Sequence, residues 1–395
     1  MKHSATLGLS ILLLATGCIA ASEPPVDAAS PDAAPAAPVD SAPPDSAEPA
    51  PTPAPLANDP DLAEELRRLA AEYEVPAMGA ATLRPGAPPR GAVVGNRRVG
   101  EADPARSSDA WHLGSNGKAM TAAAIYLAAE AGLLGTQATL SEVFPTVGVH
   151  PDHASTTLYD LLVHRGGLPD NDELPAAALA ALRAGGASPT LRAGLVEAIL
   201  EAPPAVDPSR TRYSNYAYVT AGTALETRHP GTFEEILERT LFDRLGLGSC
   251  GFGPPSGESG ALSGHLTTAA GLRPDAGDNP AWASPTGGVH CSLLDWVRFI
   301  GWMTGAAPTD APRALLAALA EPVVGRVPGW EVVAQPWAST PILVHLGTNG
   351  RWFSTAWVVP AEGRVYVATS NSGAREANEA INAAIAWMVR RDSDT

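Results

Sequence analysis

The sequence contains almost no lysine. Arginine supplies nearly all of the 26 basic residues, and the only lysines among the 395 residues are Lys2 and Lys118. Arginine stays protonated at any useful pH and cannot act as a base, whereas a buried lysine can lose its proton. Because Lys2 belongs to an N-terminal leader, we expect Lys118 to be the single lysine of the mature protein and a candidate for base chemistry.

Other absences exclude whole classes of function. The net charge of −16 leaves little to attract a nucleic-acid backbone, so we expect no nucleic-acid partner. No His-Glu-x-x-His or paired-cysteine motif is present, so we expect neither a metal nor another cofactor. No serine has a glycine both two residues before and two residues after it, which excludes the nucleophile elbow of α/β-hydrolases.

The N-terminus has the pattern of an export signal. Lys2 precedes an apolar run that is too short to span a bilayer, and the run ends in the sequence ATGC at Cys18. Residues 1–18 resemble a bacterial lipoprotein signal in which Cys18 is lipidated. The alternative is ordinary secretion with cleavage near Ala20 or Ala21, and both interpretations export the protein.

A long polar segment follows the signal. Residues 19–58 are mostly Pro, Ala, Asp and Ser, and such a composition cannot bury enough apolar surface to offset the entropy of ordering. We expect a disordered tether here, lifting a folded domain of residues 59–395 off a membrane. A low-complexity segment without a spacing role is the alternative.

Two cysteines remain after the leader, Cys250 and Cys291. They can pair in an oxidising compartment if they lie close together, which the sequence does not decide. Catalysis by Cys291 with the adjacent His290 is disfavoured, because neighbours on an extended strand point to opposite faces.

Strand-like segments lie at both ends of the domain and helical segments lie between them. Strands are predicted at 75–83, 91–100, 341–350, 354–360 and 363–371, and helices at 59–73, within 111–134, 156–166, 211–226 and 233–247, from Ser292 as N-cap, and at 376–390. This order predicts an α+β fold with an antiparallel sheet flanked by helices. The sheet part would comprise about 59–135 and 285–395, the inserted helical part about 136–284, and the site would lie where they meet.

The segment 111–134 carries the strongest chemical signal. Ser115 and Lys118 are three residues apart at the start of a helix, so both side chains project from one face. A hydroxyl beside an amine is a workable nucleophile–base pair, and the positive helix end favours a developing oxyanion. The apolar residues that follow on all sides predict an enclosed helix.

Three fragments in this order resemble one family. They are Ser-Asn-Gly-Lys at 115–118, Tyr-Ser-Asn at 213–215 and His-Leu-Gly at 345–347. The chain resembles, over about residues 60–390, the class C serine β-lactamases and the related D-Ala-D-Ala carboxypeptidases and carboxylesterases. The motifs of that family are Ser-x-x-Lys, Tyr-x-Asn and Lys-Thr-Gly, and some of its peptidases and esterases have histidine in place of the last lysine. The resemblance implies a β-lactamase/transpeptidase-like fold.

The resemblance also implies roles for the catalytic candidates. Ser115 would attack a carbonyl and form an acyl-enzyme, and Lys118 or the Tyr213 phenolate would take its proton. Asn215 would hold the substrate amide or the lysine, and Asn171 would occupy a substrate-amide position. The structural alternatives are that Tyr213 is an aromatic at the helix entry and Asn215 an N-cap.

The third motif would line the substrate site. The backbone N–H groups of Ser115 and Thr348 would form the oxyanion hole, with His345 and Gly347 beside them. His345 also has an alternative interpretation, as an ordinary strand residue.

The third motif departs from the β-lactamase pattern. Histidine replaces lysine, and Leu346 replaces the threonine whose hydroxyl binds a substrate carboxylate. Leucine cannot donate a hydrogen bond, and a site built for a carboxylate loses much when one donor is missing. Arg351 is a candidate replacement cation. We expect poor β-lactam hydrolysis and better turnover of esters or of peptides without the carboxylate contact.

The leading hypothesis is therefore an exported, lipid-anchored serine hydrolase. The alternatives are a β-lactamase or D-Ala-D-Ala carboxypeptidase, and a catalytically inactive lipoprotein that binds the cell wall or a partner protein. We expect a small-molecule or peptide substrate, with peptidoglycan one candidate, membrane association only through the lipid, and a monomer.

Overall fold

The computed structural model describes residues 55–170, 173–255 and 261–393. The chain divides into two units, Met1–Asp45 and Ser46–Thr395, and every described residue belongs to the second. The predicted lipidation site Cys18, the candidate Asn171 and most of the predicted tether lie outside the described residues. The tether prediction extends too far, because Ala57–Asn58 already form a strand.

The elements alternate along the chain as follows. The strands are β1 Ala57–Asn58, β2 Ala77–Leu83, β3 Arg90–Gly95, β4 Trp111–His112, β5 Gly251–Phe252, β6 Gly264–Thr268, β7 Gly271–Asp275, β8 Val289–Cys291, β9 Arg326–Val327, β10 Trp330–Val333, β11 Ile342–Thr348, β12 Phe353–Val359 and β13 Arg364–Ser370. The α-helices are α1 Pro60–Glu72, α2 Gly117–Glu130, α3 Leu140–Val143, α4 Leu158–Leu162, α5 Ala176–Ala184, α6 Ser188–Glu201, α7 Asn215–Glu226, α8 Phe233–Leu237, α9 Asp243–Leu245, α10 Ser284–Gly287, α11 Leu293–Thr304, α12 Arg313–Ala320 and α13 Arg375–Ser393. Short 3₁₀ turns are η1 Gly114–Asn116, η2 Pro151–His153, η5 Ala281–Ala283 and η6 Pro360–Glu362, and η4 Glu238–Phe242 is a π-helical turn between α8 and α9.

The main sheet joins the two ends of the domain. Its strand order is β1-β3-β2-β13-β12-β11-β10-β9, so strands from the first and last parts of the sequence are neighbours. All pairs are antiparallel except β1 with β3. The predicted α+β fold is confirmed, and the parallel edge strand β1 is the exception to the predicted antiparallel sheet.

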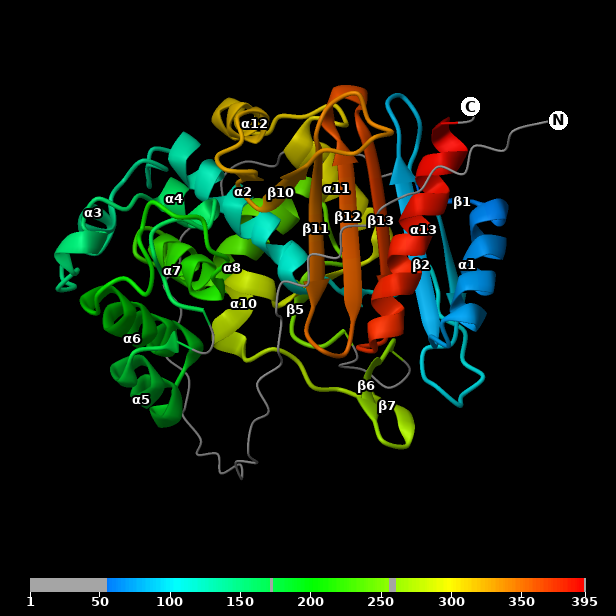
Figure 1. The fold of residues 1–395 in the computed structure, drawn as a ribbon, viewed down its shortest axis with the longest axis horizontal. Coiled ribbons are helices and arrows are strands. Elements are labelled where there is room, and N and C mark those ends of the chain that lie inside the picture. The colour runs from blue at the N-terminus through cyan, green and yellow to red at the C-terminus, as the bar shows by residue number, and fades with distance from the viewer. Residues whose placement is uncertain (1–54, 171–172, 256–260, 394–395) are drawn as a thin grey trace, which may run out of the picture. The chain divides into compact units, whose positions relative to one another are not determined.

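Helices cover both faces of this sheet. α1 and α13 lie on one face, and α11 packs against β2 and β13 on the other (Figure 1). The central strands β2, β12 and β13 are buried along almost their whole length, as expected when both faces are covered. Two apolar clusters result, one under α1 and α13 and a larger one that continues into the helical region.

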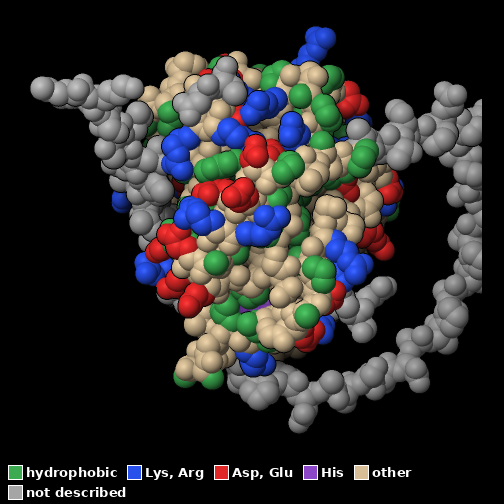
Figure 2. Space-filling model, turned by 90° about the vertical axis from the view of Figure 1, so that its right-hand side faces the viewer, with side chains coloured by type: hydrophobic (Ala, Val, Ile, Leu, Met, Phe, Trp, Pro, Cys, Tyr) green, Lys and Arg blue, Asp and Glu red, His purple; other side chains and the backbone are tan. Residues whose placement is uncertain are grey.

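The outer helix α1 is set by its cap and by an ion pair with α13. Asp59 accepts from the Leu62 N–H at 3.2 Å as the N-cap, and Pro60 follows as the first helical residue. Arg391 Nη1 and Nη2 donate to the two oxygens of the same carboxylate at 2.9 and 2.8 Å, which joins the two ends of the domain. Acidic and basic side chains are interspersed on the side of the molecule that Figure 2 shows. Arg68 of α1 forms ion pairs with two glutamates of its own helix.

The second half of β11 is an open edge. Strand β10 pairs only with residues 342–344 of β11, so His345–Thr348 have β12 on one side and, among the described residues, no paired strand on the other. The turn η1 packs against this edge. The main sheet therefore contributes to the site where the interior strand β11 loses its neighbour β10.

Helix α2 is enclosed, as predicted. Every residue from Gly117 to Ala128 is buried, against α7, α8, α10 and α12. The helical region around it is fixed by a buried ion cluster, in which fully buried Arg192 binds Glu226 at 2.5 Å and Glu234 at 3.0 Å. Within the described part of the chain, no helix has the length and apolar character needed to cross a bilayer.

Candidate active site

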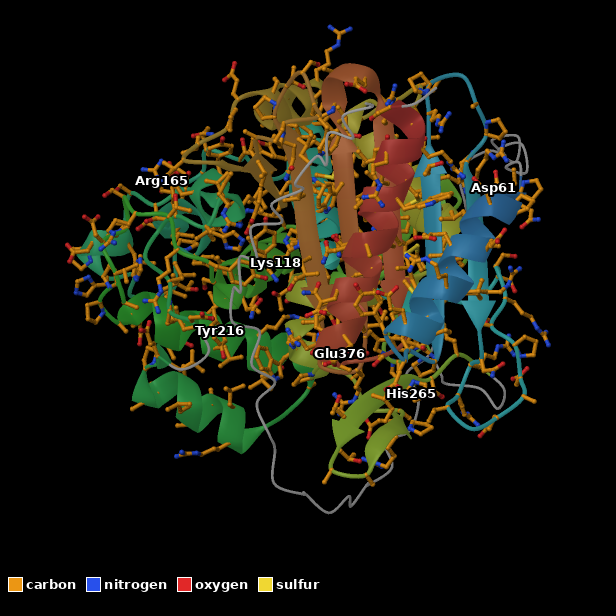
Figure 3. The ribbon with its side chains drawn as sticks, turned by 45° about the vertical axis from the view of Figure 1, so that its right-hand side comes forward. Asp61, Lys118, Arg165, Tyr216, His265 and Glu376 are labelled. Atoms are coloured by element: carbon orange, nitrogen blue, oxygen red, sulfur yellow. A yellow bond between two sulfur atoms is a disulfide. The ribbon has the colours of Figure 1, made fainter. Side chains whose placement is uncertain are left out.

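The candidate site lies around the start of α2. Lys118 lies at the start of α2, Asn215 at the start of α7 and Thr286 in α10, and the open edge of β11 faces η1. Lys118 lies between the strands of the sheet and the helical region that holds Tyr216 (Figure 3). The predicted place of the site, at the junction of the sheet with the helical region, agrees with this arrangement.

The three residues predicted to touch do so. Ser115 Oγ lies 3.1 Å from Lys118 Nζ and 2.9 Å from the Tyr213 hydroxyl. Ser115 lies in η1 and is 7 % exposed, while Lys118 has no exposed surface. The triangle of alcohol, amine and phenol is the arrangement that nucleophile activation requires.

Lys118 is held by neutral oxygen atoms. Besides Ser115 Oγ, its Nζ donates to Asn215 Oδ1 at 2.8 Å and to the Thr286 carbonyl at 2.7 Å. These two oxygens only accept, so they take two N–H groups and direct the third position of Nζ toward Ser115. An ammonium donates to the serine from that position, and a neutral amine offers it a lone pair.

Asn215 is positioned by two hydrogen bonds to its side-chain oxygen, Oδ1. Thr286 Oγ1 donates to Asn215 Oδ1 at 2.6 Å, in addition to the bond from Lys118. Both bonds use Oδ1, which leaves the amide N–H groups to donate elsewhere. The interpretation of Asn215 as an N-cap is wrong, because Ser214 caps α7 by accepting from the Ala217 N–H.

The Tyr213 ring lies beside a tilted imidazole ring and near two positively charged side chains. The His164 ring lies 4.4 Å from it, centroid to centroid, and burial followed by the positive charges of Arg326 and Lys118 lowers the pKa of His164 well below its usual value. Arg326 Cζ is 6.0 Å and Lys118 Nζ 5.0 Å from the Tyr213 centroid. Nearby positive charge is the condition under which a phenol can serve as a base at neutral pH.

The two candidate oxyanion donors lie on segments in close contact. A Cβ on Gly114 would be 2.4 Å from the Thr348 nitrogen, and one on Gly347 would be 2.0 Å from the Leu113 carbonyl. Gly114 also has φ +50°, so both positions require glycine. The Ser115 N–H lies in the first turn of η1, where backbone N–H groups have no intrahelical acceptor.

Ser354 of β12 ties this turn to the sheet. Its Oγ donates to the Leu113 carbonyl at 2.7 Å and accepts from Asn116 Nδ2 at 2.8 Å. Asn116, the second residue of the Ser-x-x-Lys motif, thereby fixes η1 against β12.

His345 occupies the lysine position of the β-lactamase motif as a neutral ring. Burial, followed by the positive charge of Lys118 and then of Arg326, lowers the pKa of His345 to about 3. Its Nδ1 lies 2.9 Å from the Leu346 carbonyl, so Nδ1 carries the proton and Nε2 keeps its lone pair. At neutral pH this position therefore supplies no positive charge.

Neither Leu346 nor Arg351 supplies the polar contact that a substrate carboxylate needs. The Leu346 side chain packs against the apolar cluster under α1 and α13 and offers no hydrogen-bond donor. Arg351, the candidate replacement cation, donates from Nε to Asp275 Oδ1 at 2.5 Å and packs on Gly277. Its charge is therefore paired with a carboxylate of the β6–β7 hairpin.

The two remaining cysteines form a disulfide. Cys250 and Cys291 are bonded across the short sheet β4-β8-β5, where Gly251 pairs with His290. The His290 ring instead contacts the Gly253 carbonyl at 2.9 Å. Catalysis by Cys291 is thus excluded, and the open question of pairing is answered.

Sequence reasoning missed several residues of the site. Thr286 binds Lys118 through its carbonyl, and Arg326 approaches Tyr213 from a strand more than a hundred residues away. His112 and Asp278 form a buried pair behind η1. No local motif marks any of them, although Thr286 lies in the fragment Ser-Pro-Thr-Gly-Gly and His112 directly precedes the Leu-Gly-Ser turn. Across the described residues, no group of three or more His, Cys, Asp or Glu side chains is arranged to hold a metal ion.

Comparisons with known proteins agree on one fold. The family model described as Beta-lactamase matches residues 62–387. A beta-lactamase/D-alanine carboxypeptidase from Pseudomonas syringae is 19% identical, with 83% of this chain and 98% of that chain covered and a TM-score of 0.68. A class C beta lactamase from Rhodobacter sphaeroides is 18% identical, with 84% and 100% covered and a TM-score of 0.67. The D-amino acid amidase from Ochrobactrum anthropi SV3, in complex with L-phenylalanine, is 17% identical, with 85% and 100% covered and a TM-score of 0.66. No curated protein sequence matches the chain.

Proposed function

Because the chain belongs to the Beta-lactamase family and is a serine hydrolase of that family, we propose that it cleaves esters or uncharged amides through an acyl-enzyme on Ser115. The hydrogen bonds that join Ser115 to Lys118 and to Tyr213 support this proposal, since they give a nucleophile two candidate bases within reach.

The proposed reaction has two halves. Ser115 Oγ attacks the carbonyl carbon, its proton passes to Lys118 or Tyr213, and the oxyanion accepts from the N–H groups of Ser115 and Thr348. The carbonyl then re-forms as the bond to the leaving group breaks, and the alcohol or amine departs with that proton. Water attacks the acyl-enzyme with the same base, which releases the acid and restores Ser115.

The substrate class rests on His345. A β-lactam or a terminal D-alanine carries a carboxylate, and the family's lysine and threonine positions hold here a neutral imidazole and the apolar Leu346. Arg326 is paired with Glu331 at 2.8 Å and Arg351 with Asp275, so neither is an uncompensated cation for that carboxylate. A buried site that lacks the partner of a charged group discriminates strongly against it.

Steady-state rates on nitrocefin and on p-nitrophenyl butyrate test the substrate class. We expect the ester kcat/KM to exceed the nitrocefin value by at least about a hundredfold, the order of effect of a missing polar partner. Ser115→Ala is the control and should abolish both activities. Nitrocefin turnover far above the ester rate would instead favour the alternative, a β-lactamase or D-Ala-D-Ala carboxypeptidase.

A second experiment separates an enzyme from a binding protein. A fluorophosphonate probe should label Ser115, as read by mass spectrometry of the peptide, and should fail on Ser115→Ala. Absence of labelling by both the fluorophosphonate and a penicillin probe would favour an inactive lipoprotein that binds the cell wall or a partner.

We also propose that the protein is exported and lipidated at Cys18, as a monomer on the Pro/Ala/Asp-rich tether. The leader pattern supports export, and so does the Cys250–Cys291 disulfide, because structural disulfides persist in oxidising compartments. Incorporation of a labelled fatty acid that is lost in Cys18→Ala is the expected result. Secretion without incorporation would favour ordinary cleavage near Ala20 or Ala21.

A further inference from the structure

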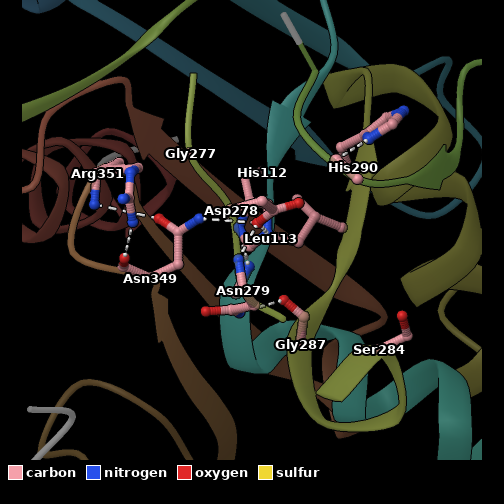
Figure 4. Close-up of polar contacts among 12 residues, drawn as sticks. His112, Leu113, Gly277, Asp278, Asn279, Ser284, Gly287, His290, Asn349 and Arg351 are labelled. Carbon is pink, nitrogen blue, oxygen red and sulfur yellow. Dashed lines mark hydrogen bonds and ion pairs between the residues drawn. The ribbon is translucent and has the colours of Figure 1, made fainter. Parts of the chain in front are cut away.

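A buried carboxylate lies behind the candidate oxyanion hole. Asp278 lies between β7 and η5, and its side chain is 9 % exposed. Its Oδ1 is 2.8 Å from His112 Nε2 and accepts from Asn349 Nδ2 at 3.1 Å and from the Asn279 N–H at 2.7 Å (Figure 4). Burial alone would raise the pKa of this carboxyl, but the hydrogen bonds that it accepts outweigh burial and lower it.

One arm of this network leads to the serine turn. His112 Nδ1 accepts from the Gly114 N–H at 3.0 Å. Because a backbone N–H can only donate, Nδ1 carries the lone pair and Nε2 carries the proton. Nε2 lies 2.8 Å from Asp278 Oδ1 without the angle of a hydrogen bond, so the carboxylate packs against the imidazole, and the imidazole holds the peptide group directly before Ser115.

The other arm leads to the strand edge. Asn349 directly follows Thr348, and its side-chain amide is bound to Asp278. Asn349 Oδ1 in turn accepts from the Arg351 N–H at 3.1 Å, which closes the turn after β11. The same carboxylate thus reaches the residue next to each candidate oxyanion donor.

We propose that Asp278 is a positioning residue for the oxyanion hole, acting through His112 on the Ser115 N–H and through Asn349 on the Thr348 N–H. This inference rests on the proposed acyl-enzyme reaction at Ser115. The close backbone contact between Gly114 and Thr348 explains why alignment matters, because a small shift of either segment changes the separation of the two donors. Each donor nitrogen must lie about 2.7–3.1 Å from the position that the oxyanion occupies, with a tolerance of about 0.5 Å.

The test compares Asp278→Ala with Asp295→Ala. Asp295 is a matched control, since its side chain is 10 % exposed and it accepts two hydrogen bonds from Ser249 away from the site. Removal of a whole oxyanion donor costs about 10²–10³ in kcat, so misalignment in Asp278→Ala should lower kcat by about tenfold to a hundredfold with KM little changed. Asp295→Ala should keep kcat within about threefold while losing similar thermal stability.

The decisive readout is the rate ratio between an ester and its thionoester. Sulfur is a weaker hydrogen-bond acceptor than oxygen, so an aligned oxyanion hole favours the ester, and misalignment reduces this preference. We expect the ratio of kcat/KM values to fall at least about fivefold in Asp278→Ala. A merely structural role would lower both rates together and leave the ratio unchanged.

His112→Phe supplies a second variant that keeps the ring volume and removes both nitrogen atoms. It should lower the ratio as well, and the double variant should be no worse than the poorer single variant, because both act through one chain. If Asp278→Ala does not fold, His112→Phe alone decides. An unchanged ratio in the folded variants overturns this inference while leaving the proposed function intact. Wild-type protein that neither hydrolyses the ester nor reacts with the fluorophosphonate overturns both.

Discussion

Replacing Lys118 by methionine should separate activity from stability. The side chain is fully buried and of similar length to methionine, so the change removes the amine and keeps most of the volume. General acid–base groups typically contribute about 10²–10⁴ in rate, equivalent to about 3–5.5 kcal/mol of barrier. We expect kcat/KM on p-nitrophenyl butyrate to fall by that factor.

The stability effect follows from the three hydrogen bonds that are lost. Ser115 Oγ keeps its bond with Tyr213, and Asn215 Oδ1 keeps its bond from Thr286, so of the three acceptors the Thr286 carbonyl is the one that keeps no second bond described here. An orphaned buried carbonyl costs about 1–3 kcal/mol, whereas burying an ammonium costs several kcal/mol. The free energy of unfolding should therefore stay level or rise by up to about 3 kcal/mol.

Thr121→Val is the matched control one turn further along α2. Its hydroxyl is fully buried and donates to the Pro285 carbonyl at 2.7 Å, on the same helix α10 that Lys118 contacts. This variant should lose about 1–3 kcal/mol of stability and keep activity within a few fold. Urea unfolding and ester kinetics on both variants measure the contrast. Activity of Lys118→Met within tenfold of wild type would refute the role assigned to the amine.

Three further predictions follow from the same contacts. Tyr213→Phe keeps the stacked ring and removes the hydroxyl, so kcat/KM should fall about a hundredfold or more across the pH profile; a loss below threefold would assign the proton transfer to the lysine. Replacing Cys250 and Cys291 together by alanine releases a loop spanning 41 residues and should lower the unfolding free energy by about 4 kcal/mol on the loop-entropy model, and wild type in dithiothreitol should match it in urea titration. His345 and His164 have pKa values below the usual 6.5 in the folded chain. Below about pH 6.5 the unfolded chain therefore binds more protons than the folded chain, and the free energy of unfolding decreases as the pH falls. His345→Asn should reduce the slope of unfolding free energy against pH by about 1.4 kcal/mol per unit between about pH 6 and pH 4, and an unchanged slope would contradict the neutral ring.

The sequence by itself determined the elements and the order of the motifs. The predicted helix at 59–73 is α1, the enclosed helix of the Ser-x-x-Lys segment is α2, and Ser292 caps α11 as expected. The three late strand segments are β11, β12 and β13. These features depend on caps, turn residues and periodicity within a few residues, which a single sequence displays directly.

Short elements and those without a strong local pattern were missed. The hairpins β6–β7 and β9–β10 and the helices α5, α6, α10 and α12 were not predicted. Most are short segments whose stability comes from packing rather than from propensity.

What only the tertiary structure decided is the chemistry of the site in detail. The contact of Tyr213 with Ser115 spans 98 positions in the sequence, that of Thr286 with Lys118 spans 168, and the Cys250–Cys291 bond spans 41. The neutrality of His345 likewise follows from its burial and from cations on two other elements. Spacing in a sequence fixes which side chains share a turn, whereas distance, burial and electrostatic environment exist only after distant segments pack together.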